Sequence, residues 1–361
     1  MWKTRTSCWT ILAANRTQSE CQFIRALYSG VLLVFICVAC SDNQPEEFQF
    51  WQAGSTMGTT FSVKIPVLPQ TVDEQHLKQE IDEILIGVNQ QMSTYLVDSE
   101  LSKINRRHVT DWLPISQQLR AVLSEALEIS RLSSGAFDVT IGPLVNLWGF
   151  GPGEAQRTIP NDSEIQALLG KIGYENLLIR VDPPALRKKM PSLFIDLSSL
   201  AKGYAVDLVA RYLDAVDIHN YLVEIGGELR AKGKKRDGRL WRVAIEKPES
   251  DKRVTEQVLE LNDIAVATSG DYRNYFEQEG VRYSHMLDPK SGRPITHNLV
   301  SVTVLSDTTM HADALATAFM VMGPERGLQL AEREGIPALF ISKAEQGFSK
   351  SQTSMFSLLT Q

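Results

Sequence analysis

The chain has 361 residues, of which 43% are hydrophobic and 22% charged, an ordinary balance for a globular protein with one large or two small domains. Its formal net charge of −6 argues against a general nucleic-acid binder, which needs a basic surface. The densest basic run, 230–239, contains Asp237-Gly238 and predicts a solvated hairpin turn that leads into a strand.

The N-terminal region has the pattern of an export signal. Residues 1–30 carry four basic side chains against one acidic one, and the apolar run 31–39 follows and ends at Cys40. This run is short for a bilayer span, so we predict a signal peptide over 1–39. Because Cys40 follows Val-Ala, the junction is similar to a bacterial lipobox, which makes Cys40 the lipidated residue and 40–50 a tether. A plain signal peptide or a single anchor helix is the alternative.

The cysteines restrict the chemistry of the mature chain. Cys8, Cys21 and Cys37 precede the predicted cut, so that the mature chain keeps only Cys40. Disulfides, cysteine zinc sites and a cysteine nucleophile are thereby excluded.

The hydrophobic periodicity predicts strands and helices without strict βαβ alternation. In chain order we expect a strand at 61–65, helices at 72–92 and 116–133, a strand at 193–197 running into a helix that opens near Ser199, strands at 221–225, 240–246, 257–267 and 298–305, helices at 311–322 and 325–334, and a strand near 337–342. This mixture favours an α+β fold, with 51–361 as a single compact unit.

The helix at 311–322 is apolar around most of its circumference, yet it contains Asp313 and Thr317. Such a helix is normally buried, and a buried carboxylate needs a cation or strong hydrogen bonds. The two residues are four apart and share one face, where they would offer hard oxygen ligands suited to Mg²⁺. The alternative is an aspartate paired with a lysine and a threonine bonded back to its own helix.

Two further segments contain candidate site residues. In 196–207, Asp196 precedes a helix whose first turn carries Lys202, a placement that opposes the helix dipole unless an anion is bound there. The alternative is a surface lysine and a capping aspartate. His285 stands before a D-P-x-x-G turn, where it could act as a base or merely bond to the turn, and Arg273 could bind a phosphate or an aspartate.

The order of these segments is more specific than any one of them. T-M-G-T at 56–59, M-S-T-Y at 92–95, G-A-F-D-V-T at 135–140, D-L-S-S-L-A-K-G-Y-A-V-D at 196–207, A-T-S-G-D-Y-R, H-M-L-D-P-K-S-G-R-P and A-D-A-L-A-T follow one another along the chain. Together they resemble the ApbE family of flavin transferases over roughly 50–345.

The resemblance implies an ApbE-type, T-fold-like arrangement of mixed sheet and helix layers. It also implies that FAD is the substrate and Mg²⁺ the cofactor, with FMN moved from FAD to a Thr or Ser hydroxyl of an acceptor protein and AMP released. Carried over by motif, the implied FAD contacts are Met57, Tyr95, Ala136, Phe137, Asp138, Asp196, Lys202 and Leu287. The implied metal ligands are Ser199, through its carbonyl, with Asp313 and Thr317, and His285 is the candidate base or hydroxyl-orienting group.

The sequence departs from the family pattern at one pair of residues, and two other functions are compatible with the same motifs. Ser198-Ser199 stands where many members have Gly-Gly, and a carbonyl ligand tolerates that change. A Mg²⁺-dependent FAD pyrophosphatase and a non-catalytic flavin-binding lipoprotein remain as alternatives. By family analogy, the acceptors are flavin-carrying subunits of the sodium-pumping NADH:quinone reductase or of Rnf-type complexes. The expected location is the periplasmic side of a bacterial cell membrane, the inner rather than the outer one, reached through the lipid anchor.

Overall fold

An antiparallel sheet of eight strands forms the centre of the molecule. The structure is a computed structural model that describes residues 48–151, 157–248, 254–272 and 274–360. The strand order is β1-β2-β6-β7-β10-β15-β16-β17, and every neighbouring pair is antiparallel. In chain order the strands are β1 Phe50–Thr56, β2 Thr59–Ile65, β6 Tyr221–Ile225, β7 Glu228–Lys232, β10 Ile264–Gly270, β15 Leu299–Ser306, β16 Ala338–Lys343 and β17 Phe348–Gln352.

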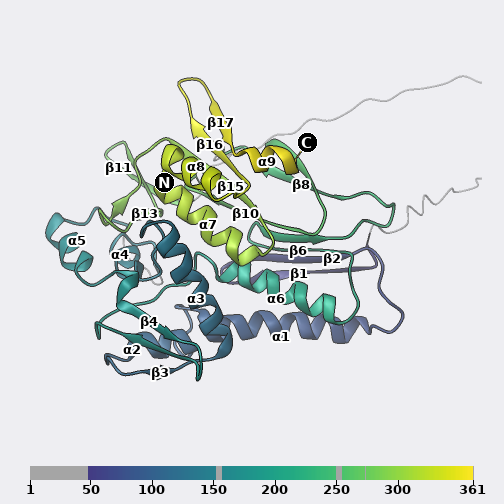
Figure 1. Ribbon diagram of the computed structural model, residues 1–361, viewed down its shortest axis with the longest axis horizontal. Coiled ribbons are helices and arrows are strands. Elements are labelled where there is room, and N and C mark those ends of the chain that lie inside the picture. The colour runs from purple at the N-terminus through teal and green to yellow at the C-terminus, as the bar shows by residue number, and fades with distance from the viewer. Residues whose placement is uncertain (1–47, 152–156, 249–253, 273, 361) are drawn as a thin grey trace, which may run out of the picture. The chain divides into compact units, whose positions relative to one another are not determined.

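Helices cover one face of this sheet and enclose the main core. Helix α6 (Ala201–Ala215) packs on β6 and β7, and α7 (Thr309–Met322) packs on β10 and β15. Figure 1 shows α6 between the first strands of the sheet and α1 (Glu74–Met92), and α3 (Gln117–Leu132) packs beside α7. The core that these helices enclose against the sheet includes fully buried side chains such as Ile81 of α1, Val209 of α6 and Phe319 of α7.

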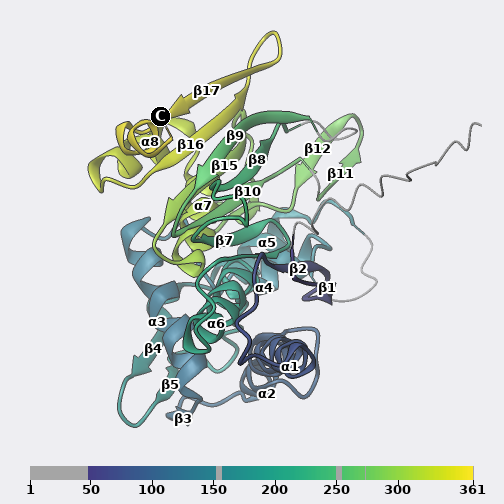
Figure 2. The same cartoon turned by 90° about the vertical axis from the view of Figure 1, so that its right-hand side faces the viewer.

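The other face of the sheet has its own apolar cluster. The hairpin of β8 (Trp241–Glu246) and β9 (Thr255–Leu261), which Figure 2 shows from the side, covers it. Helix α9 (Ser354–Leu359) contributes to the same cluster. Trp241 and Phe356 are the large aromatic side chains of this cluster. The strands β7, β10, β15 and β16 are therefore covered on both faces.

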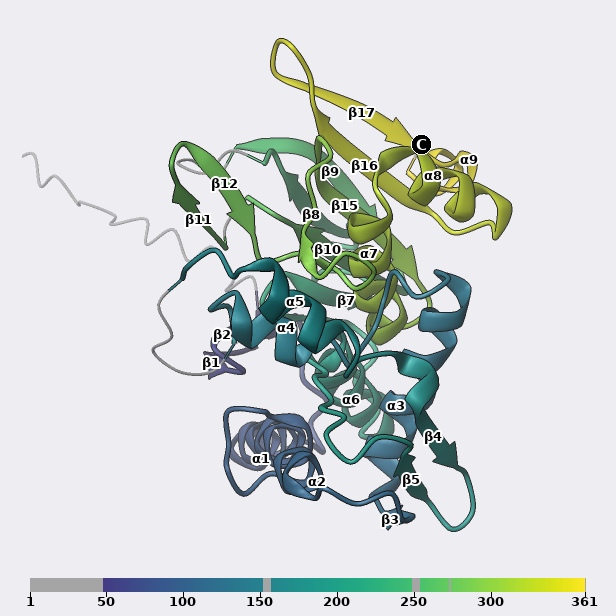
Figure 3. The ribbon, with the colours of Figure 1, turned by 90° about the vertical axis from the view of Figure 1, so that its left-hand side faces the viewer.

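Smaller elements surround the helical face. Figure 3 shows α4 and α5 with the β11–β12 hairpin on one side of the molecule, and the small sheet β3-β5-β4 near α2 and α3. Their bounds are α2 Glu100–Arg106, β3 Leu113–Pro114, α4 Gly142–Leu147, α5 Asp162–Leu169, the 3-10 turn Tyr174–Asn176, β4 Leu177–Arg180, β5 Ala185–Lys188, β11 Tyr275–Gln278, β12 Val281–Ser284, β13 Leu287–Asp288, β14 Arg293–Pro294 and α8 Pro324–Arg333. Within the described ranges, no helix has the length and apolar character needed to span a membrane.

The α+β class and most of the predicted elements are confirmed. The Ser116 side chain caps α3, and Gly323, with a φ of 81°, ends α7; serine and glycine are typical residues at these two positions. The prediction of one strand over 257–267 is wrong, because a turn at Asp263, with a φ of 53°, separates β9 from β10. The hairpin turn at Asp237-Gly238 lies between β7 and β8, and the bridge Lys234–Leu240 closes it.

The predicted strand at 193–197 is also wrong. This segment is extended but joins no sheet, since the Asn105 side chain accepts a hydrogen bond from the Ile195 amide at 2.9 Å and donates one to its carbonyl at 2.8 Å. The amide of Asp196 donates to the Val139 carbonyl at 2.7 Å. Contacts with residues far away in the sequence thus replace a strand ladder, and the following helix begins at Ala201 rather than at Ser199.

Candidate functional site

A cavity of about 380 Å³ lies where α6, α7 and the loops after α3 and β12 meet. Most of the residues that the sequence predicted for the site line it. They are Tyr95, Ala136, Phe137, Asp138, Asp196, Ser199, Lys202, His285, Leu287, Asp313 and Thr317. Segments separated by more than two hundred residues in the sequence thus meet around one space. The roles of these residues as ligands stay predictions.

Met57 lines a second cavity of about 500 Å³ that adjoins the first. Tyr95, Asp196 and Lys202 line both. Met57 and Gly58 form the two-residue turn between β1 and β2, with φ values of 50° and 72°. This type of turn favours Asn or Gly, so a methionine in the left-handed region is a strained choice of the kind found at functional sites.

Close packing of α6 against the start of α7 sets the position of the site. At Gly203, an added Cβ would lie 2.4 Å from the Thr309 carbonyl oxygen. One turn later, the Asp207 carboxylate accepts hydrogen bonds from the amides of Thr309 and Met310 at 2.8 and 2.9 Å. These bonds satisfy free donors in the first turn of α7, and a carboxylate is favourable at that end of the helix dipole. The two helices are therefore held in a fixed register.

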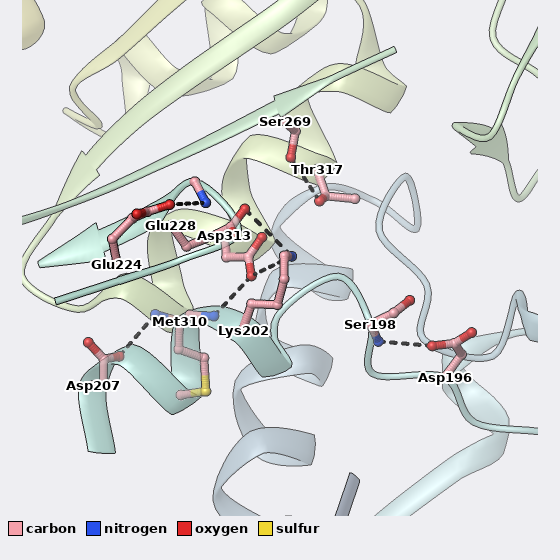
Figure 4. A network of polar contacts seen from close by, with 12 residues as sticks. Asp196, Ser198, Lys202, Asp207, Glu224, Glu228, Ser269, Met310, Asp313 and Thr317 are labelled. Carbon is pink, nitrogen blue, oxygen red and sulfur yellow. Dashed lines mark hydrogen bonds and ion pairs between the residues drawn. The ribbon is translucent and has the colours of Figure 1, made fainter. Parts of the chain in front are cut away.

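Lys202 lies between two buried carboxylates (Figure 4). Its ammonium nitrogen is 3.5 Å from Asp313 Oδ2 and 3.5 Å from Glu228 Oε1. Asp313 Oδ2 also accepts a hydrogen bond from the Gly203 amide at 3.1 Å. The lysine side chain is 25% exposed, whereas those of Glu228 and Asp313 are 5% and 3% exposed. Asp313 is thus paired with a lysine, as one of the two sequence interpretations expected.

The pairs are long for charge-assisted hydrogen bonds, which are typically about 2.7–2.9 Å. Burial raises the pKa of Asp313 and outweighs the attraction of Lys202, and burial likewise raises the pKa of Glu228 to about 8. Although burial by itself lowers the pKa of Lys202, the two carboxylates raise it above its usual value. Two carboxyl groups thus share one ammonium in a buried place, and a further cation beside them would favour their ionised forms.

The donor set fits Mg²⁺. Asp313 and Thr317 both line the cavity, and the Thr317 hydroxyl pairs with Ser269 Oγ at 3.1 Å rather than with its own helix. Ser199 lines the same cavity, and Glu228 Oε2 is buried without a hydrogen-bond partner. In the described part of the chain, no three His, Cys, Asp or Glu side chains are grouped as a metal site. The predicted set is of another kind, with one carboxylate, a hydroxyl and a carbonyl.

His285 follows β12 and lines the same cavity. Its Nδ1 lies 3.0 Å from the Asn274 carbonyl oxygen. Because a carbonyl only accepts, Nδ1 carries the proton and Nε2 is the acceptor of the neutral ring. Burial lowers the pKa of His285 below its ordinary value. The ring is therefore neutral at pH 7 and able to accept a proton.

Two predicted contact residues also organise their own loops. Asp138 accepts hydrogen bonds from the Thr140 amide and hydroxyl at 2.7 and 2.6 Å and from the Tyr174 amide at 3.0 Å. Asp196 accepts one from the Ser198 amide at 2.9 Å, which stabilises the turn before α6 but does not cap the helix, since its N-cap residue Leu200 has no side-chain cap bond. These bonds fix the shape of the cavity wall. Cys40 and Arg273 lie outside the described residues.

The sequence interpretation missed Glu228 and Ser269 as lining residues. Glu228 alternates with Arg230 and Lys232 along β7, a pattern typical of a solvent-facing side. That side instead faces the helices, and the residues between, Leu229 and Ala231, pack into the second apolar cluster. The only sequence signal for Glu228 is its place directly after Gly226-Gly227, which form a tight turn with φ values of 66° and 108°.

Comparisons with known proteins agree with this fold. Residues 57–340 match the model of the ApbE family. A Vibrio cholerae protein named FAD:protein FMN transferase is 49% identical over 326 residues, covering 90% of this chain and 97% of that protein. A Haemophilus influenzae protein of the same name is 40% identical over 345 residues, covering 94% and 99%.

A solved structure described as the flavin transferase ApbE from Vibrio cholerae superposes with a TM-score of 0.80 at 48% identity, covering 86% of this chain and 98% of that one. The chain belongs to the ApbE family. The resemblance seen in its ordered motifs is thereby confirmed, and so is the ApbE-type fold.

Proposed function

We propose that this protein is an FAD:protein FMN transferase that depends on Mg²⁺. The convergence of Lys202, Asp313, Thr317 and His285 on one cavity is the observation that carries the proposal. The names of relatives that match nearly the whole chain support the same activity. In the proposed reaction, the acceptor is a Thr or Ser hydroxyl of another protein and the leaving group is AMP.

The residues of the cavity have distinct parts in this reaction. Met57, Tyr95 and Phe137 offer apolar and aromatic walls for the rings of FAD, and the cationic Lys202 would contact its pyrophosphate. The acceptor hydroxyl oxygen bonds to the phosphorus of the FMN half, and the bond from that phosphorus to the AMP phosphate breaks. His285 Nε2 takes the hydroxyl proton. Phosphoryl transfer depends mainly on such positioning and on charge neutralisation.

Asp313 and Thr317, with the Ser199 carbonyl, would hold the Mg²⁺. When bound, this ion neutralises charge on the pyrophosphate and on the departing phosphate. Neighbouring residues orient these ligands: Gly203 and Lys202 orient the Asp313 carboxylate, and Ser269 orients the Thr317 hydroxyl.

The location and the acceptors belong to the same proposal. Cys40 carries the lipid and attaches the enzyme to the periplasmic side of the inner membrane, where flavin-carrying subunits of the sodium-pumping NADH:quinone reductase or of Rnf-type complexes are the acceptors. The lipobox-like pattern before Cys40 supports the anchor. Mass spectrometry of the mature N-terminus tests it, because lipidation adds a diacylglyceryl mass at Cys40 and ordinary signal cleavage does not.

One assay tests the activity itself. The purified full chain is mixed with FAD, Mg²⁺ and a periplasmic flavin-acceptor domain, and the intact mass of the acceptor is measured while AMP is quantified. An acceptor heavier by one FMN, formed only with Mg²⁺, is the expected result. AMP and free FMN with an unmodified acceptor would instead indicate an FAD pyrophosphatase. Bound FAD without either product would indicate a flavin-binding lipoprotein.

A further inference from the structure

Glu228 is the one acidic group of the cavity cluster to which neither the motifs nor the proposed chemistry gives a part. It is the first residue of β7, and the tight turn at Gly226-Gly227 brings it to the cavity wall. Its Oε1 is 3.5 Å from the Lys202 ammonium, and its Oε2 is buried without a hydrogen-bond partner. A buried carboxylate with one free oxygen is costly to keep, which points to a role in the loaded site.

The position of Lys202 suggests what that role is. Among the residues that the structure describes, Asp313 and Glu228 are the carboxylates that pair with Lys202. Asp313 is also the carboxylate of the proposed Mg²⁺ site. A divalent cation at Asp313 would repel the ammonium that lies 3.5 Å from the same carboxylate. Lys202 then needs another anionic partner, and Glu228 Oε1 already lies 3.5 Å from its ammonium nitrogen (Figure 4).

We propose that Glu228 is a positioning residue: it holds Lys202 when Mg²⁺ takes over Asp313, so that the metal and the lysine act on the pyrophosphate side by side. This inference rests on the proposed function, because it takes the Mg²⁺ site as given. Without Glu228, the metal would have to displace Lys202 from its last carboxylate.

The inference gives Glu228→Gln a distinctive signature. The change keeps the shape of the side chain and removes its ability to carry charge. Mg²⁺ binding should weaken by tenfold or more, as is typical when a group that supports a metal ligand is lost, within the usual range of about 10–100-fold. FAD binding in the absence of metal should not weaken, since Asp313 still pairs with Lys202 in that state.

The experiment uses the full chain and two titrations that need no acceptor protein. Isothermal titration calorimetry with MgCl₂ alone gives the metal affinity, and quenching of flavin fluorescence in EDTA gives the metal-free FAD affinity. Glu224→Gln is the matched control, because Glu224 lies in the same hairpin, bonds to Ser62 and the Gly227 amide, and does not line the cavity. It should change neither affinity.

Two further comparisons test whether Glu228 affects Mg²⁺ binding through Lys202. Glu228→Asp keeps the charge and should bind Mg²⁺ better than Glu228→Gln, which separates charge from folding effects. In a Lys202→Met background no ammonium competes for Asp313, so Glu228→Gln should cost much less Mg²⁺ affinity than in the wild type. Equal losses in both backgrounds would overturn the positioning role.

Three further outcomes distinguish this inference from the proposed function. If the wild type binds Mg²⁺ and Glu228→Gln binds it equally well, the inference fails and the metal site stands. The inference also fails if metal-free FAD binding falls in parallel with Mg²⁺ binding, because a general structural role then explains both. If the wild type binds no Mg²⁺ with or without FAD, the metal part of the proposed function is wrong and the inference falls with it.

Discussion

Replacing Gly203 by alanine should separate α6 from α7 and damage the site without changing any residue that lines it. The added Cβ would lie 2.4 Å from the Thr309 carbonyl oxygen and 2.7 Å from Met310 Cα, and both of these atoms belong to the backbone. Comfortable contacts are about 3.5–4.0 Å, so the helices must move apart by roughly 1 Å. Such overpacking costs about 1–3 kcal/mol, and the higher helix propensity of alanine returns about 1 kcal/mol. Backbone atoms cannot yield as a side chain can, so the overpacking cost should lie at about 3 kcal/mol. After the gain in helix propensity is subtracted, we expect the free energy of unfolding to fall by about 2 kcal/mol.

Urea unfolding followed by circular dichroism measures this loss, and flavin fluorescence measures its effect on the site. FAD binding with Mg²⁺ should fall sharply, because the Gly203 amide that orients Asp313 Oδ2 moves with α6. Gly87→Ala is the control: an added Cβ there meets nothing within 4 Å, and the variant should gain about 0.5–1 kcal/mol. If Gly203→Ala is as stable as Gly87→Ala and binds FAD normally, the close packing described for α6 and α7 is refuted.

Three further predictions concern single residues of the cavity. Asp313→Ala should abolish Mg²⁺-dependent transfer and leave FAD binding weaker but measurable by fluorescence; full activity would remove Asp313 from the metal site. His285→Ala should lower the transfer rate more than FAD affinity. The neutral ring accepts the proton, and burial lowers the pKa of His285 below 6.5. The wild-type transfer rate should therefore hold at pH 7 and decline only as the pH falls through that lowered pKa. If the residual rate of His285→Ala declines over the same acidic range, this role of His285 is contradicted. Met57→Asn should raise the free energy of unfolding by relieving a left-handed residue that costs about 1 kcal/mol or more, yet weaken FAD binding, and calorimetry with flavin titration measures both.

Much of the fold followed from local sequence signals. The cap at Ser116 and the terminator at Gly323 act within one helical turn, so their effects are visible in a short stretch of sequence. The strand predicted at 193–197 failed because Asn105, about ninety residues earlier, satisfies the backbone of that segment. A preference for extended backbone is local, but the partner that completes it is not.

The sequence predicted which segments line the cavity better than it predicted which charged side chains pair inside it. The order of family motifs predicted which segments would meet, from Tyr95 to Thr317. It did not predict Glu228, because the alternation of β7 indicates a solvent-facing side wherever only one face of a sheet is buried. Here α6 and α7 cover one face and the β8–β9 hairpin covers the other. Only the tertiary arrangement turns an ordinary charged strand residue into a buried partner of Lys202.

The wall that the two cavities share bears on how products depart. Tyr95, Asp196 and Lys202 border both spaces, and Tyr95 is 66% exposed. A long substrate laid across this wall and cut there would leave one fragment on each side. In the proposed reaction the acceptor hydroxyl makes this cut, so one fragment is already attached to the acceptor when the other is released. The second cavity would then give the released fragment a space apart from the one where the acceptor hydroxyl reacts.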